Sequence, residues 1–252
     1  MAENDLFRSL LNKMRKAALI CRFFGIAFAL ACALQLSVQP ARAEMVEVAP
    51  GVKVTKKVYS GPINEQPFFG FVEKTPAMRA IDDAFVSGII QAAGTREKAF
   101  EETALRGWKA LALGNLPEAA KRFNQAFLLA PERSEVYHGL AAVVQTRFND
   151  VEFAEELFKI ARKQPDPLKN VNADYGRLLM IAKRPRDAQS VLEQAVIDNP
   201  DFGDAWSNLA FARLQNGERV AACAAASEAA KHVTSTHASY DLALFKTQAQ
   251  CD

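Results

Sequence analysis

The stretch GNLPEAAKRFNQAFLLAP, residues 114–131, decides the fold, because three later stretches align with it. These are NDVEFAEELFKIARKQP at 149–165, KRPRDAQSVLEQAVIDNP at 183–200 and GERVAACAAASEAAKHV at 217–233. Each holds a small residue, an apolar or small residue four positions later, and an alanine three positions after that. The triplets are Ala119/Phe123/Ala126, Ala154/Phe158/Ala161, Ala188/Leu192/Ala195 and Ala222/Ala226/Ala229. Their first members are 35, 34 and 34 residues apart, which indicates a tandem repeat.

The spacing within each triplet predicts a helix. Steps of four and three residues stay on one helical face. Alanine at the outer positions lets a neighbouring helix approach closely, and the middle residue fills the space between the helices. Pro131 and Pro200 end their helices and turn the chain.

Another helical pattern precedes each of these helices. Its four copies are TALRGWKALALG, EVYHGLAAVVQTRF, ADYGRLLMIAK and DAWSNLAFARLQNG. Gly107, Ala141, Gly176 and Ala210 occupy the same repeat position in them, where a small residue allows tight packing inside a pair. The sequence therefore predicts an all-α chain of four helix pairs.

These pairs resemble the tetratricopeptide repeat (TPR), in which a W-x-x-L-G/A first helix precedes an A-x-x-x-F-x-x-A second helix and a proline. The fourth unit matches best in its first helix, with Trp206, Leu209 and Ala210, and the first unit in its second helix. The second unit has one extra residue before its second helix. Two units depart from the family pattern, in which a pair of large apolar residues occupies the first helix. The first unit has Thr103 and Arg106 there, and the third has Asn172 and Tyr175. These replacements predict that the first helices of both units are rotated or irregular.

The resemblance implies a right-handed superhelical solenoid of helix pairs with capping helices, since terminal repeats must cover their apolar ends. We expect the four units to span residues 100–234. Residues 75–99 are predicted to form an N-terminal capping helix, with Thr75 as N-cap, and residues 235–252 a C-terminal one.

In the family, the first helices line a concave groove that binds a segment of another protein. Carried over by position, the groove residues of this chain are Trp108, Leu111, His138, Arg177, Met180, Phe211 and Leu214. Aromatic anchors of this kind are enriched at binding hot spots. The alternative is that these residues have only structural roles. Trp108 and Phe211 would then pack only against neighbouring helices, and Arg177 would pair only with Asp174 or Asp204.

Residues 44–74 show no helical period and contain several turn signals. We interpret them as an irregular N-terminal arm, with one or two short strands near its start. Its aromatic cluster, Phe68, Phe69 and Phe71, either binds a partner or docks onto the protein's own first helices.

Residues 1–43 read as a signal peptide. Basic residues precede FFGIAFALACAL at 23–34, and Ala41 and Ala43 then form a small-x-small cleavage site before Glu44. An uncleaved anchor is the alternative, and Met14 is a second candidate initiator. Cys32 faintly resembles a lipidation site. We expect an exported protein, periplasmic if the source is a Gram-negative bacterium.

Export also affects the interpretation of the cysteines. Only Cys223 and Cys251 follow the signal, and an oxidising compartment favours a disulfide between them. The alternative is a buried Cys223 and a free Cys251.

The charge of the chain and its lack of catalytic motifs disfavour several classes of function. Beyond residue 43 the chain carries 25 basic and 27 acidic residues, which disfavours nucleic acid as a partner. The sequence contains no C-x-x-C, H-E-x-x-H, G-x-S-x-G or S-x-x-K motif and no phosphate-binding glycine loop, and its three histidines lack metal-site spacing. We expect no enzyme activity, no cofactor, no metal and no small-molecule substrate. The expected function is a scaffold or adaptor that binds a peptide or helix of another exported or envelope protein. The alternative is a structural subunit of an envelope assembly that uses its convex face and the aromatic arm.

Overall fold

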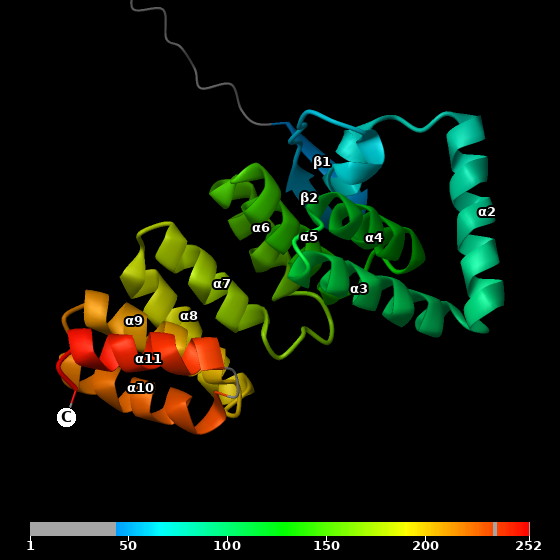
Figure 1. Ribbon diagram of the computed structural model, residues 1–252. Coiled ribbons are helices and arrows are strands. Elements are labelled where there is room, and N and C mark those ends of the chain that lie inside the picture. The colour runs from blue at the N-terminus through cyan, green and yellow to red at the C-terminus, as the bar shows by residue number, and fades with distance from the viewer. Residues whose placement is uncertain (1–43, 234–235, 252) are drawn as a thin grey trace, which may run out of the picture. The chain divides into compact units, whose positions relative to one another are not determined.

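The computed structural model describes residues 44–233 and 236–251. Most of its regular structure is helical, and from residue 96 onward the helices follow one another in four pairs (Figure 1). These are α3 (Arg96–Ala112) with α4 (Leu116–Leu129), α5 (Ser134–Val143) with α6 (Val151–Ala161), α7 (Val171–Ile181) with α8 (Pro185–Asp198), and α9 (Gly203–Gln215) with α10 (Arg219–His232). The helices of each pair pack on each other, which confirms the predicted all-α repeat.

Small residues allow the close approach of these helices. The first alanine of every triplet is completely buried. The Phe123 ring of α4 lies against Gly107 of α3 and Gly139 of α5, and a Cβ added at Gly139 would come within 2.1 Å of that ring. In the third unit a Cβ at Gly176 would come within 2.4 Å of Leu192. The middle residue of the triplet thus fills space that a glycine leaves open, as the sequence predicts.

The second unit absorbs its extra residue in a π-helix. This segment, η3 (Val144–Phe148), continues directly from α5, and such insertions are a recognised way to add one residue to a helix. Asn149 follows in the left-handed region with φ 53°. Asp150 then caps α6, because its Oδ1 accepts a 3.0 Å hydrogen bond from the Phe153 N–H.

The polar substitutions in the first helices do not make them irregular, contrary to the sequence-based expectation. Thr103 is buried in α3, and its hydroxyl donates a 2.7 Å hydrogen bond to the Ala99 carbonyl. Asn172 is buried in α7, and its Nδ2 donates to Asp198 Oδ2 of α8 at 2.5 Å. Both helices remain regular because these side chains find partners on their own helix or its pair mate.

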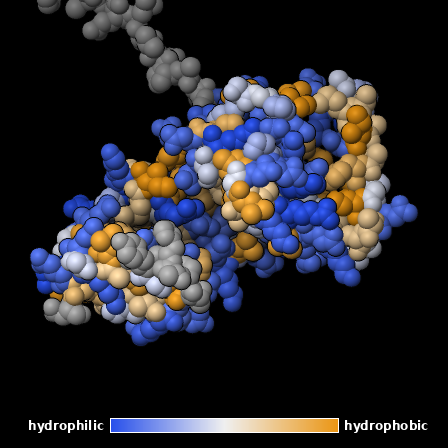
Figure 2. Space-filling model, in the orientation of Figure 1, coloured by the Kyte–Doolittle hydropathy of each residue, from blue (hydrophilic) through white to orange (hydrophobic). Residues whose placement is uncertain are grey.

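The segment predicted as one N-terminal capping helix is divided in two. α2 (Pro76–Ala93) begins at Thr75, whose Oγ1 accepts a hydrogen bond from the Met78 N–H. It ends at Gly94, where φ is 88°, a conformation that favours glycine. α3 then starts a new helix from its own cap, Thr95. None of the α2 residues is buried, and hydrophobic side chains show along this helix in Figure 2.

The C-terminal helix α11 (Thr236–Gln248) packs on α10. A disulfide between Cys223 of α10 and Cys251 ties the end of the chain to the last repeat. On α11, Phe245 is only 1% exposed. The helix therefore covers the apolar end of the fourth unit, in the place expected for a C-terminal capping helix.

The N-terminal arm is ordered against the repeats. Strands β1 (Met45–Ala49) and β2 (Val52–Thr55) form an antiparallel hairpin that pairs Met45 with Thr55. Two short 3₁₀ segments follow, η1 (Ile63–Glu65) and η2 (Pro67–Phe71). The Thr55 N–H donates to Glu156 Oε1 of α6 at 2.6 Å, so the hairpin is fastened to the second unit.

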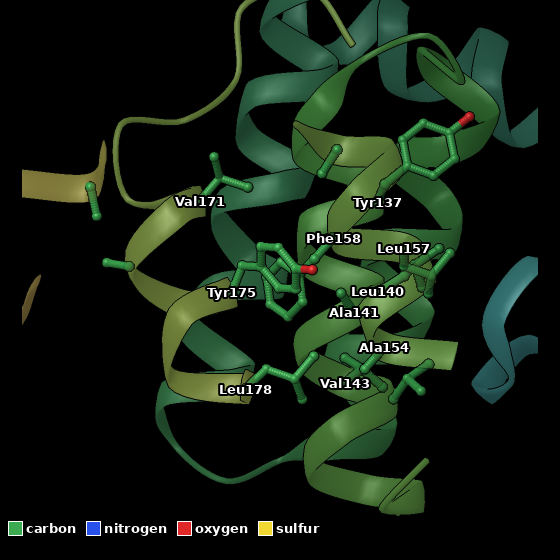
Figure 3. Packing of buried hydrophobic residues seen from close by; sticks show 14 of the residues in the cluster. Tyr137, Leu140, Ala141, Val143, Ala154, Leu157, Phe158, Val171, Tyr175 and Leu178 are labelled. Carbon is green, nitrogen blue, oxygen red and sulfur yellow. The ribbon is translucent and has the colours of Figure 1, made fainter. Parts of the chain in front are cut away.

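The core runs through all four units, and Figure 3 shows the part of it where residues of α5, α6 and α7 meet. Phe158 and Tyr175 stack there with ring centroids 5.8 Å apart. In residues 44–233 and 236–251 no helix is both long and apolar enough to cross a membrane. The predicted signal at residues 1–43, with Ala43 and Cys32, lies outside the described residues. Glu44, on the other side of the predicted cleavage site, is the first described residue and is exposed.

Candidate functional site

The predicted binding residues lie on the first helices of the four pairs. We call them the first-helix row: Trp108 and Leu111 of α3, His138 of α5, Arg177 and Met180 of α7, and Phe211 and Leu214 of α9. The structure gives them unequal roles. His138 is fully buried, Arg177 and Phe211 are exposed, and the other four are half-buried.

Trp108 joins the first unit to the second. Its indole Nε1 donates a 2.7 Å hydrogen bond to Glu135 Oε1 at the start of α5. Its ring meets the rings of Phe123 and His138 edge-on, with centroids 5.0 and 4.8 Å away. Trp108 is thus mainly a packing residue, one of the two roles that the sequence left open. Glu135 is the residue that fixes its orientation.

His138 joins the second unit to the third. Its Nε2 lies 2.8 Å from Asp174 Oδ2 of α7, and its ring lies 5.5 Å from that of Phe158. The imidazole is 0% exposed, and Nδ1 has no hydrogen-bond partner among the described residues. A side chain buried in this way holds two helices together and is not accessible to a ligand. This corrects the expectation that His138 lines the groove.

Arg177 is the exposed cation of the row. Its guanidinium lies 3.7 Å from Asp174 Oδ1, and its side chain remains 51% exposed. Asp174 also accepts a 3.3 Å hydrogen bond from Asn170 Nδ2. Its carboxylate therefore contacts three side chains, those of His138, Asn170 and Arg177. The long contact leaves the guanidinium free to bind an acceptor on a ligand.

Phe211 and Leu214 lie at the C-terminal end of the row. The Phe211 ring meets Phe245 of α11 edge-on at 4.6 Å, yet Phe211 remains 38% exposed. A pocket of about 430 Å³ opens here, lined in part by Ser207, Phe211 and Leu244. The capping helix therefore forms one wall of the site, which the repeat pattern alone did not indicate.

The aromatic cluster of the arm is not a free binding element. Phe68 is 6% exposed and meets the Phe127 ring of α4 edge-on at 5.3 Å. Phe71 packs partly buried against the same core, and the Lys74 ammonium lies 3.7 Å above the Phe69 ring. Of the two alternatives for the cluster, the structure shows the docked one.

Polar contacts hold the arm in place. Asn124 Nδ2 of α4 donates to the carbonyls of Asn64 and Gln66, at 3.0 and 2.7 Å. Glu65 pairs with Arg147 at 2.7 Å and with Lys121 at 3.2 Å. Hydrogen bonds from Arg147 and Lys121 hold the pKa of the Glu65 carboxyl below its usual value.

The chemistry of the row suits binding. Its imidazole and indole are engaged in contacts between helices, with the carboxylates of Asp174 and Glu135, and its exposed part combines apolar surface with one guanidinium. Within the described ranges, no three side chains of the His, Cys, Asp and Glu types lie close enough together to hold a metal ion.

Comparison with known proteins shows the fold. No family model matches the sequence, and no curated protein matches it. Among solved structures, PilF of Pseudomonas aeruginosa is 22% identical, covers 61% of this chain and 68% of its own, and has a TM-score of 0.55. TTC0263, a TPR protein of Thermus thermophilus, is 18% identical over 67% of this chain and 98% of its own, with a TM-score of 0.48. The likeness to PilF and the four helix pairs together show that this chain has the tetratricopeptide-repeat fold.

Proposed function

We propose that this chain is an exported, non-enzymatic scaffold that binds a segment of another protein along its first-helix row. The observation that carries the proposal is the exposure of Arg177 and Phe211 on α7 and α9, with half-buried Met180 and Leu214 beside them. A mixed surface of apolar side chains and one guanidinium suits a polypeptide, which offers both side chains and carbonyl acceptors.

The row is also rigidly supported. Trp108 and His138 bind residues of the next unit through side-chain hydrogen bonds, and Gly139 and Gly176 hold the backbones at close contact. Supporting contacts of this kind lower the entropy lost on binding, because the site is formed in advance. The proposed partner is a peptide or helix of another exported or envelope protein, in keeping with the predicted signal at residues 1–43.

A photo-crosslinking experiment in cells tests the proposal, with the crosslinkable residue at Leu214, so that the Arg177 guanidinium is kept. Val220 at the start of α10 is 84% exposed and lies on a second helix, so it is the control position. We expect one discrete adduct from position 214 and none from position 220. Adducts from neither position would contradict the proposal.

The second candidate is a structural subunit that binds through its second helices. Val220 and Ile197, at 84% and 71% exposure, favour it because both apolar side chains lie on second helices. This alternative also expected the aromatic cluster of the arm to contact a partner, but the cluster is docked onto the protein's own helices. An adduct from position 220 alone would favour it over the scaffold.

A further inference from the structure

A basic pocket lies away from the first-helix row, at the junction of the second and third units. The connection between α6 and α7 spans residues 162–170, whereas the corresponding connections elsewhere are residues 130–133 and 199–202 (Figure 1). The longer connection, together with the ends of α6 and α8 and the start of α7, encloses a pocket of about 630 Å³. A volume of this size is in the range of ligand-binding pockets, roughly 300–1,000 Å³.

Cations dominate the rim of this pocket. Four line it, namely Lys159, Arg162, Lys163 and Lys169, against the single carboxylate of Asp198. Lys159 pairs with Glu155 at 2.8 Å. Within the described part of the chain the other three form no ion pair, although the Arg162 guanidinium lies 5.3 Å from the Tyr175 ring. Residues 162–169 hold these three cations and one carboxylate, Asp166. The segment therefore has a net positive charge and a local positive field, on a chain that is slightly acidic beyond residue 43.

The inner wall of the pocket has a different character. Pro167, Leu168 and Val171 supply apolar surface. Asn172 is 7% exposed, and its Nδ2 is committed to Asp198, while its Oδ1 has no hydrogen-bond partner among the described residues. A buried acceptor without a partner costs free energy, so a ligand that brings an N–H donor to this wall would be favoured.

We propose that this pocket is a second binding site, for an acidic peptide segment of a partner protein. The peptide carboxylates pair with Arg162, Lys163 and Lys169. Its apolar side chains lie on the wall formed by Leu168 and Val171, and a backbone N–H donates to Asn172 Oδ1. An inorganic anion would meet only the first of these needs, and it would fill little of the pocket.

The test titrates the isotope-labelled full chain with acetyl-Leu-Glu-Leu-Asp-Leu-amide and follows the NMR spectrum. The control peptide replaces the Glu and Asp by Gln and Asn. We expect saturable shifts at Lys163 and Leu168 and in the Asn172 side-chain amide with the acidic peptide, and none with the control peptide. Binding should weaken as salt is added, because exposed charges are screened. Absence of saturable shifts at these residues, or equal shifts with both peptides, would overturn the proposal.

Charge-reversal variants locate the site. Arg162→Glu with Lys163→Glu should weaken binding by about tenfold or more, roughly 1.4 kcal/mol. Lys109→Glu with Arg186→Glu changes the net charge equally at exposed positions that do not line the pocket, and should leave binding unchanged. Equal loss in both double variants would show attraction by net charge alone and would refute the site. Two further titrations use sodium phosphate and vesicles of phosphatidylglycerol. If either competes fully with the peptide and reproduces the Asn172 shift, the pocket takes phosphate groups and the peptide assignment is wrong.

Discussion

Trp108 Nε1 of the first unit lies 2.7 Å from Glu135 Oε1 of the second, and His138 Nε2 of the second unit lies 2.8 Å from Asp174 Oδ2 of the third. Each bond joins one first helix to the next. Residues that the repeat pattern places at a binding surface therefore also hold that surface in shape. Substitutions at these positions should change stability as well as binding.

Trp108→Phe separates the hydrogen bond from the packing. Phenylalanine keeps an aromatic ring beside Phe123 and His138 but removes the N–H that Glu135 accepts. We expect a loss of about 0.5–1.5 kcal/mol in the free energy of unfolding, measured by urea denaturation. Trp108→Ala should cost more, about 3 kcal/mol, because the ring contacts are lost too. Equal losses in the two variants would mean that the ring contributes nothing.

Gly139→Ala tests the close approach of α4 and α5. The new Cβ would lie 2.1 Å from the Phe123 ring, so the ring or the helix must move. Overpacking of this kind costs about 1–3 kcal/mol. Gly88→Ala in α2 is the matched control, because a Cβ there meets nothing within 4 Å. That change should stabilise the protein by about 0.5–1 kcal/mol, since alanine favours a helix over glycine. A neutral Gly139→Ala would contradict the packing described above.

The sequence predicts the repeat itself well and its exceptions poorly. The spacing of Ala119, Ala154, Ala188 and Ala222 reveals the helix pairs, because each alanine holds the same repeat position and is completely buried. The π-helix at the end of α5 escapes this reasoning, since an extra residue can be absorbed in a loop or in a helix. Only tertiary contacts decide between the two.

The candidate site shows the same limit. His138 and Asp174 are 36 residues apart in sequence, and repeat position alone does not say which histidine becomes buried. The docked arm depends on Asn124, a polar residue within an apolar helical face that carries no repeat signal. The basic pocket likewise arises from a long connection that contains no inserted residue, because Ala161 and Gly176 are as far apart in sequence as Ala126 and Ala141. The connection is long because α6 ends early and α7 begins late, which the repeat alignment does not reveal.

Loss of the Cys223–Cys251 disulfide should loosen α11. The bridge closes a loop of 28 residues, for which the chain-entropy model gives a stabilisation of about 3–4 kcal/mol. Adding dithiothreitol should lower the melting temperature and speed proteolysis near residue 250. The double variant Cys223→Ser with Cys251→Ser should have the lower melting temperature before any reductant is added, and dithiothreitol should not change it. An unchanged melting temperature on reduction of the native protein would contradict this expectation.

Acid should weaken the docking of the arm through Glu65. Its pKa is lowered in the folded protein by hydrogen bonds from Arg147 and Lys121. A lowered pKa contributes stability that is present above the unfolded-state pKa, about 4.3, and lost as the pH falls through the folded-state value. The free energy of unfolding of the native protein should therefore drop below about pH 4.3 more steeply than that of Glu65→Gln. Parallel curves for the two proteins would mean that the ion pairs contribute nothing.

Arg177→Glu should abolish partner capture while leaving the fold intact. The guanidinium is exposed, and its contact with Asp174 is long, at 3.7 Å. Loss of this ion pair should therefore lower the free energy of unfolding by no more than about 1 kcal/mol. Reversing its charge, however, places a carboxylate beside Asp174 where the proposed partner would offer acceptors. With the crosslinker at Leu214, the adduct should disappear in Arg177→Glu and persist in Arg186→Glu, an exposed charge reversal on α8. A persistent adduct in both variants would show that the guanidinium is not part of the binding surface. The apolar residues Met180, Phe211 and Leu214 would then have to account for binding by themselves.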